Sequence, residues 1–358
     1  MVTRKVVRAG IVGAGWMGQV HARSWVRNSP RGVIAAVTDV SEPRARALSD
    51  EHAGGQARIH ADLDALLADR EVDAVDICLP HHLHADAIVR AARAGKHVFC
   101  EKPLCLSFDE ARTIKRALDE SGVTLVAAHN NLFSLPLIEA RKLLADGVLG
   151  KTYYAESFEI GRNTGFIAGK APVPLAEGES SIAWRRDPKR MGGAELLDTG
   201  WHGMYRLLSL VDSRPVEVVA MAANHHIKTL PGEDTAHVLL NFASGVQGSM
   251  LTSWAFGGEP GAWQFRVHGE HGSIAGSVTK LVLAPTNWPA APAERNWDTT
   301  HGETYVREVT HFLDVLLDGT ESQASWSHAA RTLQCIQAGY LSLREKRVVP
   351  LPDDPTEL

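Results

Sequence analysis

Short apolar runs alternate with amphipathic stretches over the first third of the chain. The runs predict buried strands at residues 5–12, 32–38, 75–79, 98–100 and 124–127. Between them, apolar positions recur at helical spacing, which predicts helices at 18–28, 42–52, 62–68, 84–94 and 107–121. Strands that alternate with helices of this length indicate parallel β-α-β units, with helices on both faces of one sheet.

After about residue 130 the pattern changes, and strands begin to follow one another directly. Strands are predicted at 151–160, 216–224, 236–242, 246–254, 263–269 and 281–284, and helices at 135–145, 196–211, 303–317 and 327–344. The segment Ala243-Ser-Gly245 lies between two strands and is typical of a tight hairpin turn, so the second sheet is expected to be antiparallel. We therefore expect an α/β protein with two domains, 1–130 and 131–358, whose last helix can pack back on the first.

The length and composition agree with this division. At about 150 residues per domain, 358 residues make two domains. The chain is 44% hydrophobic and 22% charged, as is ordinary for a soluble globular protein. Its net charge is −5 and no long block of like charges occurs, which argues against a nucleic-acid partner. No window of ~18 apolar residues occurs, so no membrane span is expected.

The cysteines carry no recognisable site. Cys78, Cys100, Cys105 and Cys335 form no Cys-x-x-Cys pair, which argues against a disulfide framework, a zinc knuckle or a thioredoxin-type motif. Arg8 interrupts the first apolar run, so this run does not read as a signal peptide. Sparse cysteine and no targeting segment together favour the cytoplasm.

A glycine-rich turn follows the first predicted strand and opens the first helix. In Gly13-Ala-Gly15-Trp-Met-Gly18, the first glycine would make the tight turn, the second would let a pyrophosphate approach, and the third would let helix pack on strand. The helix N-terminus would then face the phosphates. Asp39 ends the second strand, where an acid accepts hydrogen bonds from ribose hydroxyls and disfavours a 2′-phosphate. We expect NAD(H) rather than NADP(H); a structural turn with a chance acid is the weaker interpretation.

Two further turns end parallel strands, where ligands bind in open α/β sheets. The first is Leu79-Pro80-His81, followed by His84, and the second is Glu101-Lys102-Pro103. A partly desolvated ammonium at Lys102 can polarise a reacting oxygen. From position alone, a surface lysine before a proline turn is the commoner interpretation.

Asp198 and His202 lie in the second half, four residues apart and therefore on one helical face. A histidine near its ordinary pKa can take the proton of an alcohol, and a nearby carboxylate can orient it or the substrate. Taken alone, the spacing is more often that of an Asp–His pair with a structural role.

These segments together resemble the glucose–fructose oxidoreductase / inositol dehydrogenase family, known as Gfo/Idh/MocA. The matching motifs are Gly13 to Gly18 with His21, Pro80 with His84, Glu101-Lys102-Pro103, and Gly192-Gly193 through Asp198-Thr-Gly200-Trp-His202. The resemblance implies a Rossmann doubly wound parallel sheet, followed by an α/β domain whose open, mainly antiparallel sheet mediates homodimers or homotetramers. It also implies Lys102, Asp198 and His202 as the active-site trio, in a chemistry that needs no metal.

The expected contacts follow from these motifs and their flanks. Cofactor contacts are expected at Gly13, Gly15, Trp16, Met17, Gly18, Asp39, Leu79, Pro80, His81, His84, Glu101, Lys102 and Asn130. Substrate contacts are expected at Lys102, His129, Trp184, Arg185, Asp198 and His202. No metal is expected, because His81, His82 and His84 lack a matching set of ligands.

The function these features favour is an NAD-dependent dehydrogenase that oxidises a secondary hydroxyl of a sugar, sugar derivative or cyclitol. One alternative is a redox-neutral enzyme that retains NAD and works through a keto intermediate, as an epimerase or in glycosidic-bond cleavage. A second is a non-catalytic dinucleotide sensor, which would have no need of a proton acceptor. The polar loop at 161–190 is expected to select the substrate.

Overall fold

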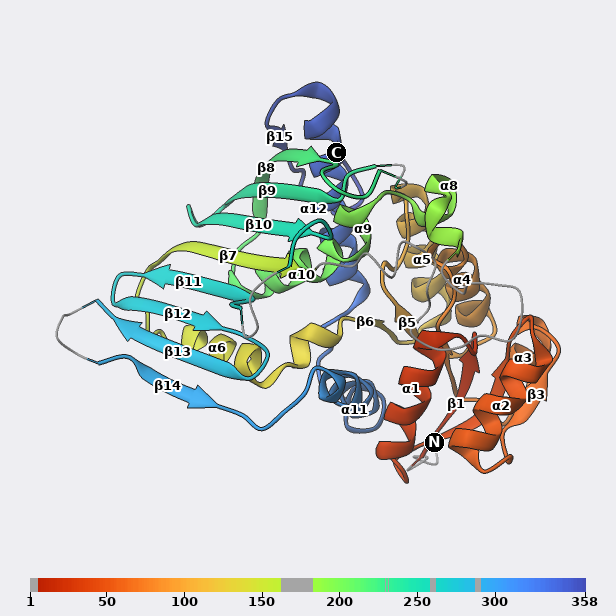
Figure 1. Ribbon diagram of the computed structural model, residues 1–358. Helices are drawn as coiled ribbons and strands as arrows, with labels where there is room; N and C mark the ends of the chain where they lie inside the picture. Colours follow the sequence, from red (N-terminus) through yellow and green to blue (C-terminus); the bar gives the residue numbers. More distant parts are fainter. Residues whose placement is uncertain (1–5, 162–182, 229, 231, 258–261, 287–290) are drawn as a thin grey trace. The chain divides into compact units, whose positions relative to one another are not determined.

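The chain forms two units, which Figure 1 draws as ribbons. The computed structural model describes residues 6–161, 183–228, 230, 232–257, 262–286 and 291–358. Among these, the first unit comprises residues 6–130 and 304–330, and the second comprises the others. Crossings between the units fall after residues 130, 303 and 330.

The first unit is built on a six-stranded sheet in the order β3-β2-β1-β4-β5-β6. Its strands are β1 Val7–Val12, β2 Gly32–Thr38, β3 Arg58–His60, β4 Ala74–Ile77, β5 His97–Glu101 and β6 Leu125–Ala128. All neighbouring pairs are parallel, which confirms the predicted doubly wound sheet. The strand order reverses between β1 and β4, the point where ligands bind in such sheets. Strand β3 was not predicted, because its three residues include one apolar side chain.

Helices of the first unit are α1 Trp16–Arg27, α2 Glu42–Ala53, α3 Leu63–Ala68, α4 His84–Arg93, α5 Phe108–Ser121 and α11 Gly302–Asp318, with the 3₁₀ turn η1 His81–Leu83. Helix α11 comes from the far end of the sequence and completes the core. Its Phe312 stacks on Phe99 of β5 at 5.2 Å between ring centroids and meets the edge of Trp25 of α1 at 6.1 Å. All three rings are fully buried. The core of the first unit therefore depends on a segment that follows most of the second unit in the sequence.

The second unit contains a nine-stranded sheet in the order β14-β13-β12-β11-β7-β10-β9-β8-β15. Its strands are β7 Thr152–Ile160, β8 Pro215–Ala223, β9 Thr235–Phe242, β10 Gln247–Ser253, β11 Phe265–Gly269, β12 Gly272–Gly276, β13 Lys280–Pro285, β14 Ala293–Asn296 and β15 Val349–Pro350. Strands β7 and β10 pair in parallel and the other neighbours are antiparallel, which confirms a mainly antiparallel sheet. The predicted hairpin joins β9 to β10.

Helices of the second unit are α6 Leu135–Ala145, α8 Pro188–Met191, α9 Glu195–Asp198, α10 Gly200–Leu210 and most of α12 Trp326–Glu345, with the 3₁₀ turns η2 Asn130–Phe133 and η3 Ala183–Arg186. Two glycines let α10 approach the sheet closely. A Cβ on Gly200 would lie 3.1 Å from Thr252, and one on Gly203 would lie 3.0 Å from Met250. Strand β10 therefore sets the position of the helix that carries His202.

The prediction of one continuous helix at 196–211 is wrong, because the segment forms two helices. The structure breaks it at Thr199 into α9 and α10. The hydroxyl of Thr199 donates to the carboxyl group of Glu195 at 2.6 Å, and the amide N–H of His202 donates to the Thr199 carbonyl, three residues back. Side chains of this type favour such local bonds over helical ones. Asp198 and His202 consequently lie on separate helices.

None of the helices in the described part of the chain is long and apolar enough to cross a membrane.

The packing of β11 against β12 yields a stability prediction. A Cβ on Gly276 would lie 2.1 Å from the ring of Phe265, which is fully buried. Gly276→Ala should therefore lower the free energy of unfolding by about 1–3 kcal/mol through overpacking. Urea unfolding measures the loss, and adding Phe265→Leu should restore part of it. Gly302→Ala, whose Cβ would meet an atom at 3.6 Å, is the control and should change stability by less than about 0.5 kcal/mol.

Candidate functional site

The glycine turn after β1 is closely packed at two of its three glycines. Gly13 has φ +99°, and a Cβ there would lie 2.6 Å from the Cys78 carbonyl oxygen. A Cβ on Gly18 would lie 2.0 Å from the Gly13 carbonyl oxygen. A Cβ on Gly15 would meet nothing within 4 Å. The first and third glycines thus serve the fold, whereas the second leaves open space at the N-terminus of α1.

Asp39 is tied to this turn. One carboxylate oxygen accepts the amide N–H of Ala14 at 2.8 Å. The other accepts the amide N–H of Ser41 at 2.8 Å and the guanidinium of Arg44 at 2.9 Å. Arg46 turns away and pairs with Glu42. The acid expected to meet a ribose is therefore fixed against the turn expected to meet the phosphates.

The turns that follow β4 and β5 are joined through His84. Its Nδ1 lies 2.7 Å from the Pro103 carbonyl oxygen, and its Nε2 lies 2.7 Å from the Leu79 carbonyl oxygen. The amide N–H of Lys102 donates to the Glu101 carboxylate at 2.9 Å. Lys102 is 8% exposed, so water covers little of it. The predicted residues Leu79, His84, Glu101 and Lys102 thus belong to one connected edge of the sheet.

The remaining residues predicted to contact the cofactor differ in exposure. Trp16 is exposed at the start of α1 and Met17 is half-buried, whereas His81 is buried in η1. Asn130 is buried, and its amide nitrogen donates to the Thr304 hydroxyl at 2.9 Å.

Of the residues predicted to contact the substrate, His129 is fully buried, and burial lowers its pKa to about 3. The His129 ring is therefore neutral at physiological pH.

In the second unit, three predicted substrate residues come together. The guanidinium of Arg185 donates to the Asp198 carboxylate at 2.7 Å, and its Cζ lies 4.3 Å from the ring centroid of Trp184. Asp198 is buried. A carboxylate, a guanidinium and an aromatic face are the groups that bind polyols and sugars by hydrogen bonding and stacking.

His202 has a partner that the sequence analysis missed. Its Nδ1 lies 2.8 Å from the hydroxyl of Tyr205, three residues later on α10. The same hydroxyl accepts the amide N–H of Asn131 at 3.1 Å. The i, i+3 spacing was the available signal, since such residues are neighbours on a helix. The bonds found here link Asp198 to Arg185 and His202 to Tyr205.

A buried carboxyl group supports the start of this segment. Glu195 is fully buried and accepts hydrogen bonds from the hydroxyls of Thr199 and Thr252. Burial raises its pKa well above the usual value, so it is held as a neutral acid. Glu233 accepts the Tyr340 hydroxyl at 2.9 Å, and that hydroxyl accepts the amide N–H of Ala194 at 3.0 Å. These bonds position the backbone just before Asp198.

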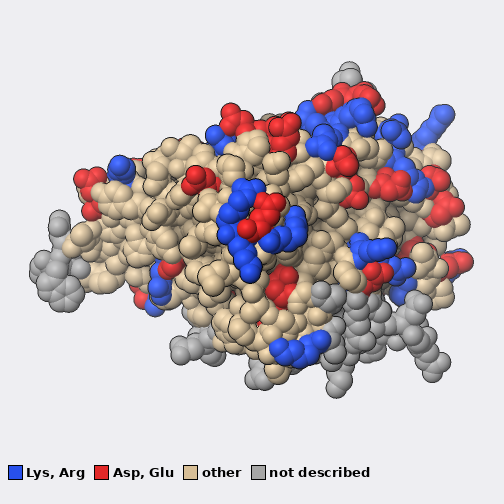
Figure 2. Space-filling view, turned by 90° about the horizontal axis from the view of Figure 1, so that it is seen from above, with Lys and Arg blue, Asp and Glu red and all other residues tan. Residues whose placement is uncertain are grey.

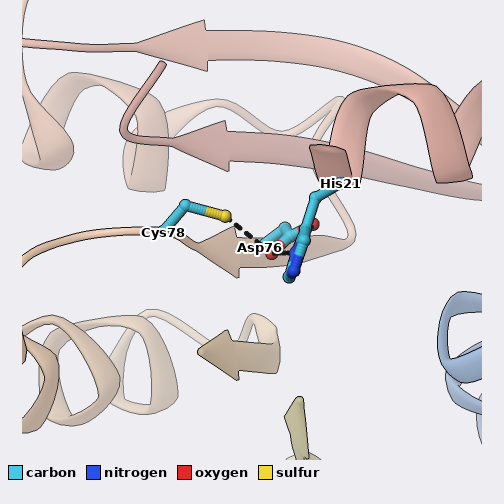
Figure 3. Close-up of side chains that lie close together, drawn as sticks. All are labelled: His21, Asp76 and Cys78. Atoms are coloured by element: carbon cyan, nitrogen blue, oxygen red, sulfur yellow. Dashed lines mark hydrogen bonds and ion pairs between the residues drawn. The ribbon is translucent and has the colours of Figure 1, made fainter. Parts of the chain in front are cut away.

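Potential metal ligands meet at His21, Asp76 and Cys78, whose ligand atoms lie within 4.8 Å of one another (Figure 3). Burial raises the pKa of the Cys78 thiol, whereas a thiolate is the form that binds metals. The thiol lies 3.4 Å from Asp76, and Nδ1 of His21 lies 2.8 Å from the same carboxylate. The donor atoms are thus engaged with one another, and the group does not suit a metal ion.

Comparison with known proteins gives a consistent result along the chain. Residues 7–129 match the family model described as an oxidoreductase family NAD-binding Rossmann fold. Residues 141–351 match that of an oxidoreductase family C-terminal alpha/beta domain. Inositol 2-dehydrogenase of Rhizobium meliloti is 28% identical over 354 residues, covering 96% of this chain and 99% of the relative. D-apiose dehydrogenase of Paraburkholderia graminis is 26% identical, covering 98% and 91%.

Solved structures show the same architecture. GenD2 from gentamicin A biosynthesis, in complex with NAD, superimposes with a TM-score of 0.79 at 25% identity and covers 98% of each chain. Levoglucosan dehydrogenase, in complex with NADH and levoglucosan, has a TM-score of 0.83 at 21% identity and covers 97% of this chain and 100% of its own. The second similarity concerns the fold alone.

The glycine turn yields a prediction that separates binding from folding. Gly15→Ala should weaken NAD⁺ binding by about tenfold or more, close to 1.4 kcal/mol, because the new methyl group enters the open space at the helix start. Its melting temperature should stay near that of the parent. Gly18→Ala is the matched variant and should lower the melting temperature, since its Cβ would lie 2.0 Å from a backbone oxygen. Calorimetric titration and thermal unfolding measure the two effects. If Gly15→Ala binds NAD⁺ with unchanged affinity, the prediction that this turn contacts the dinucleotide is wrong.

Proposed function

Because the chain belongs to the Gfo/Idh/MocA family of oxidoreductases, we propose that it is an NAD-dependent dehydrogenase acting on a secondary hydroxyl of a sugar, sugar derivative or cyclitol. Relatives that span the chain are named as dehydrogenases of a cyclitol or a sugar, including inositol 2-dehydrogenase and D-apiose dehydrogenase. The observation that carries the proposal is the group formed by Trp184, Arg185 and Asp198. The same unit contains His202, whose ring is hydrogen-bonded to the hydroxyl of Tyr205. This set of side chains can bind a polyol and accept its proton.

The first unit would hold the dinucleotide. The open space at Gly15 and the N-terminus of α1 suit the pyrophosphate, and the fixed carboxylate of Asp39 suits the ribose hydroxyls. The same carboxylate would repel a 2′-phosphate, which supports NAD(H) over NADP(H) even though Arg44 lies beside it. When bound, the nicotinamide supplies the acceptor for the substrate's hydride. Lys102 donates a hydrogen bond to the substrate oxygen and stabilises its developing negative charge.

The second unit would supply the base. With Nδ1–H of His202 donating to the Tyr205 hydroxyl, Nε2 is the ring nitrogen that accepts the substrate's proton. The Tyr205 oxygen has two lone pairs, so it can accept from both His202 and the Asn131 amide. This arrangement orients the ring, and with the proton on Nδ1 it would leave the Nε2 lone pair to accept a proton. Asp198, held by Arg185, accepts a hydrogen bond from a substrate hydroxyl and orients it.

The second candidate function is a redox-neutral reaction with retained NAD. It is favoured by a partial match to 2,7-anhydro-N-acetylneuraminate hydratase of Mediterraneibacter gnavus, 30% identical over 189 residues, or 53% of this chain and 46% of the relative. Two measurements separate the functions: whether NAD stays with the purified protein, and whether NADH accumulates during turnover. A screen of sugars and cyclitols with added NAD⁺, beginning with myo-inositol and apiose, identifies the substrate of a dehydrogenase. Most of the 161–190 loop expected to select it lies outside the described residues.

The open face of the second sheet would join copies of the chain. Along β9, Ala236, Val238 and Leu240 are buried, so the intervening side chains lie on the opposite face. That face includes Leu239, 44% exposed, and Met221 of β8, 79% exposed. Large apolar side chains at this exposure suit a homodimer or homotetramer interface.

No nucleic-acid partner is proposed, because basic side chains lie beside acidic ones on the face that Figure 2 shows.

The roles of Lys102 and His202 can be tested by truncation. Lys102→Ala and His202→Ala should each lower kcat by at least about a hundredfold, because each removes a group acting on the reacting oxygen. The dissociation constant of NAD⁺ should change little in His202→Ala. Lys115→Ala, which removes a lysine paired with Asp119 on the surface, is the control and should keep full activity. Near-normal turnover in both active-site variants would refute the mechanism.

The interface proposal has its own test. Leu239→Lys should shift the protein toward monomers, because it places a charge in the proposed apolar contact. Light scattering coupled to size-exclusion chromatography measures the mass. Lys228→Ala, a change at an exposed residue in the loop between β8 and β9, serves as the control. A parent protein that is already monomeric at micromolar concentration would reject the interface.

A further inference from the structure

A group of ionisable side chains is buried behind the Lys102 turn, and the mechanism above does not use it. His21 of α1 lies between two carboxylates, with Nδ1 2.8 Å from Asp76 of β4 and Nε2 3.2 Å from Glu101 of β5. Glu308 of α11 lies 3.8 Å from Nε2. His21, Asp76 and Glu308 are fully buried, and Glu101 is 7% exposed. Figure 3 shows the His21 ring against Asp76, with Cys78 on the other side of the carboxylate.

The geometry sets the protonation state of His21. A neutral imidazole carries one N–H and one lone pair, so one of its nitrogens would face a carboxylate oxygen without a hydrogen. An imidazolium donates at both nitrogens. Burial alone would lower the pKa of His21, but the charge of Asp76 and its hydrogen bond raise the pKa well above its usual value. Geometry and charge agree on a protonated ring.

The two glutamates differ in charge. Burial would raise the pKa of Glu101, but the hydrogen bond and charge of His21, followed by the charge of Lys102, lower it. Burial raises the pKa of Glu308 well above its usual value, and neither of its oxygens has a hydrogen-bond partner among the described residues. Glu101 is therefore a carboxylate, whereas Glu308 is a neutral acid.

Glu101 connects this group to the proposed active site. One of its oxygens accepts from His21, and the other accepts the amide N–H of Lys102 at 2.9 Å. We propose that His21 is a permanently protonated positioning residue, which holds the Glu101 carboxylate in place and thereby fixes the backbone from which the Lys102 side chain projects. The inference rests on the proposed function of Lys102. It adds that the charge of His21, and not merely its shape, supports that function.

The ring state can be tested without any turnover. In the full-length protein with ¹⁵N-labelled histidine, both ring nitrogens of His21 should carry protons throughout pH 6–9, a range within which an ordinary histidine, with a pKa of about 6.5, loses its second ring proton. His21→Gln assigns the signals. A ring nitrogen without a proton within this range would overturn the proposal, whatever the enzyme's activity. A dehydrogenase screen that finds no substrate would instead count against the proposed function and leave this result untouched.

The charge-dependent role is tested by the pH profile of kcat. The titratable groups that face His21 or Glu101 come from four elements: Asp76 and Cys78 at β4, Cys100, Glu101 and Lys102 at β5, Tyr305 and Glu308 of α11, and His84 of α4. Removing the His21 charge should raise the pKa of Glu101, because Lys102 alone is then left to oppose the effect of burial. His21→Gln should therefore lower kcat about tenfold or more near neutral pH and move the acidic limb of its profile upward by about one unit or more.

Glu308→Gln is the matched control within the same group. An amide mimics a neutral acid in size and polarity, so this variant should keep kcat within about twofold and leave the acidic limb unchanged. A large loss of activity in Glu308→Gln, or an unmoved acidic limb in a folded His21→Gln, would overturn the proposal. If His21→Gln does not fold, the ring-nitrogen spectrum and the Glu308→Gln profile still decide the matter.

Discussion

One buried charge joins the elements of the first unit. The His21 ring of α1 meets Asp76 of β4 and Glu101 of β5, and Glu308 of α11 closes the group. Trp25 adds a hydrogen bond to Asp76 at 2.7 Å. Removing one partner of such a pair leaves a charge without compensation in the interior, which costs about 3–5 kcal/mol. Helix α1, which follows the glycine turn, and strand β5, which ends just before Lys102, are therefore held by the same interaction.

In the second unit, neutral contacts position the helix that carries His202, beside the ion pair of Arg185 with Asp198. Close approach of α10 to β10 at Gly200 and Gly203 sets the depth of the helix, and Glu195, in the preceding helix α9, accepts hydrogen bonds from Thr199 and Thr252. Two hydroxyl groups make further hydrogen bonds here: that of Thr199, at the helix break, with Glu195, and that of Tyr205 with His202. The difference fits the proposed roles, because a base must gain and lose a proton, whereas a positioned cation must keep its charge.

Local patterns in the sequence predicted much of this fold. Continuous apolar runs flanked by helices identified the central parallel strands, and the glycine spacing identified the turn at Gly13. Strand β12 was missed because two of its five residues are glycine, which sheets disfavour. The break at Thr199 depends on Glu195 and on a threonine 53 residues away, at position 252. Likewise, no local pattern connects His21 to Glu308, since tertiary packing alone brings them together.

The hydrogen bond between Asn130 and Thr304 has a consequence for how the two units are connected along the chain. It joins the last residue before the second unit to the first residue after it, at 2.9 Å between side-chain atoms. Almost the whole second unit can thus be regarded as an insertion between two neighbouring points of the first. A gene deletion that spliced residue 130 to residue 304 through a short linker would retain Glu308, Phe312 and the backbone bond from Ala127 to Ala324. A fragment ending at residue 130 would lose all three.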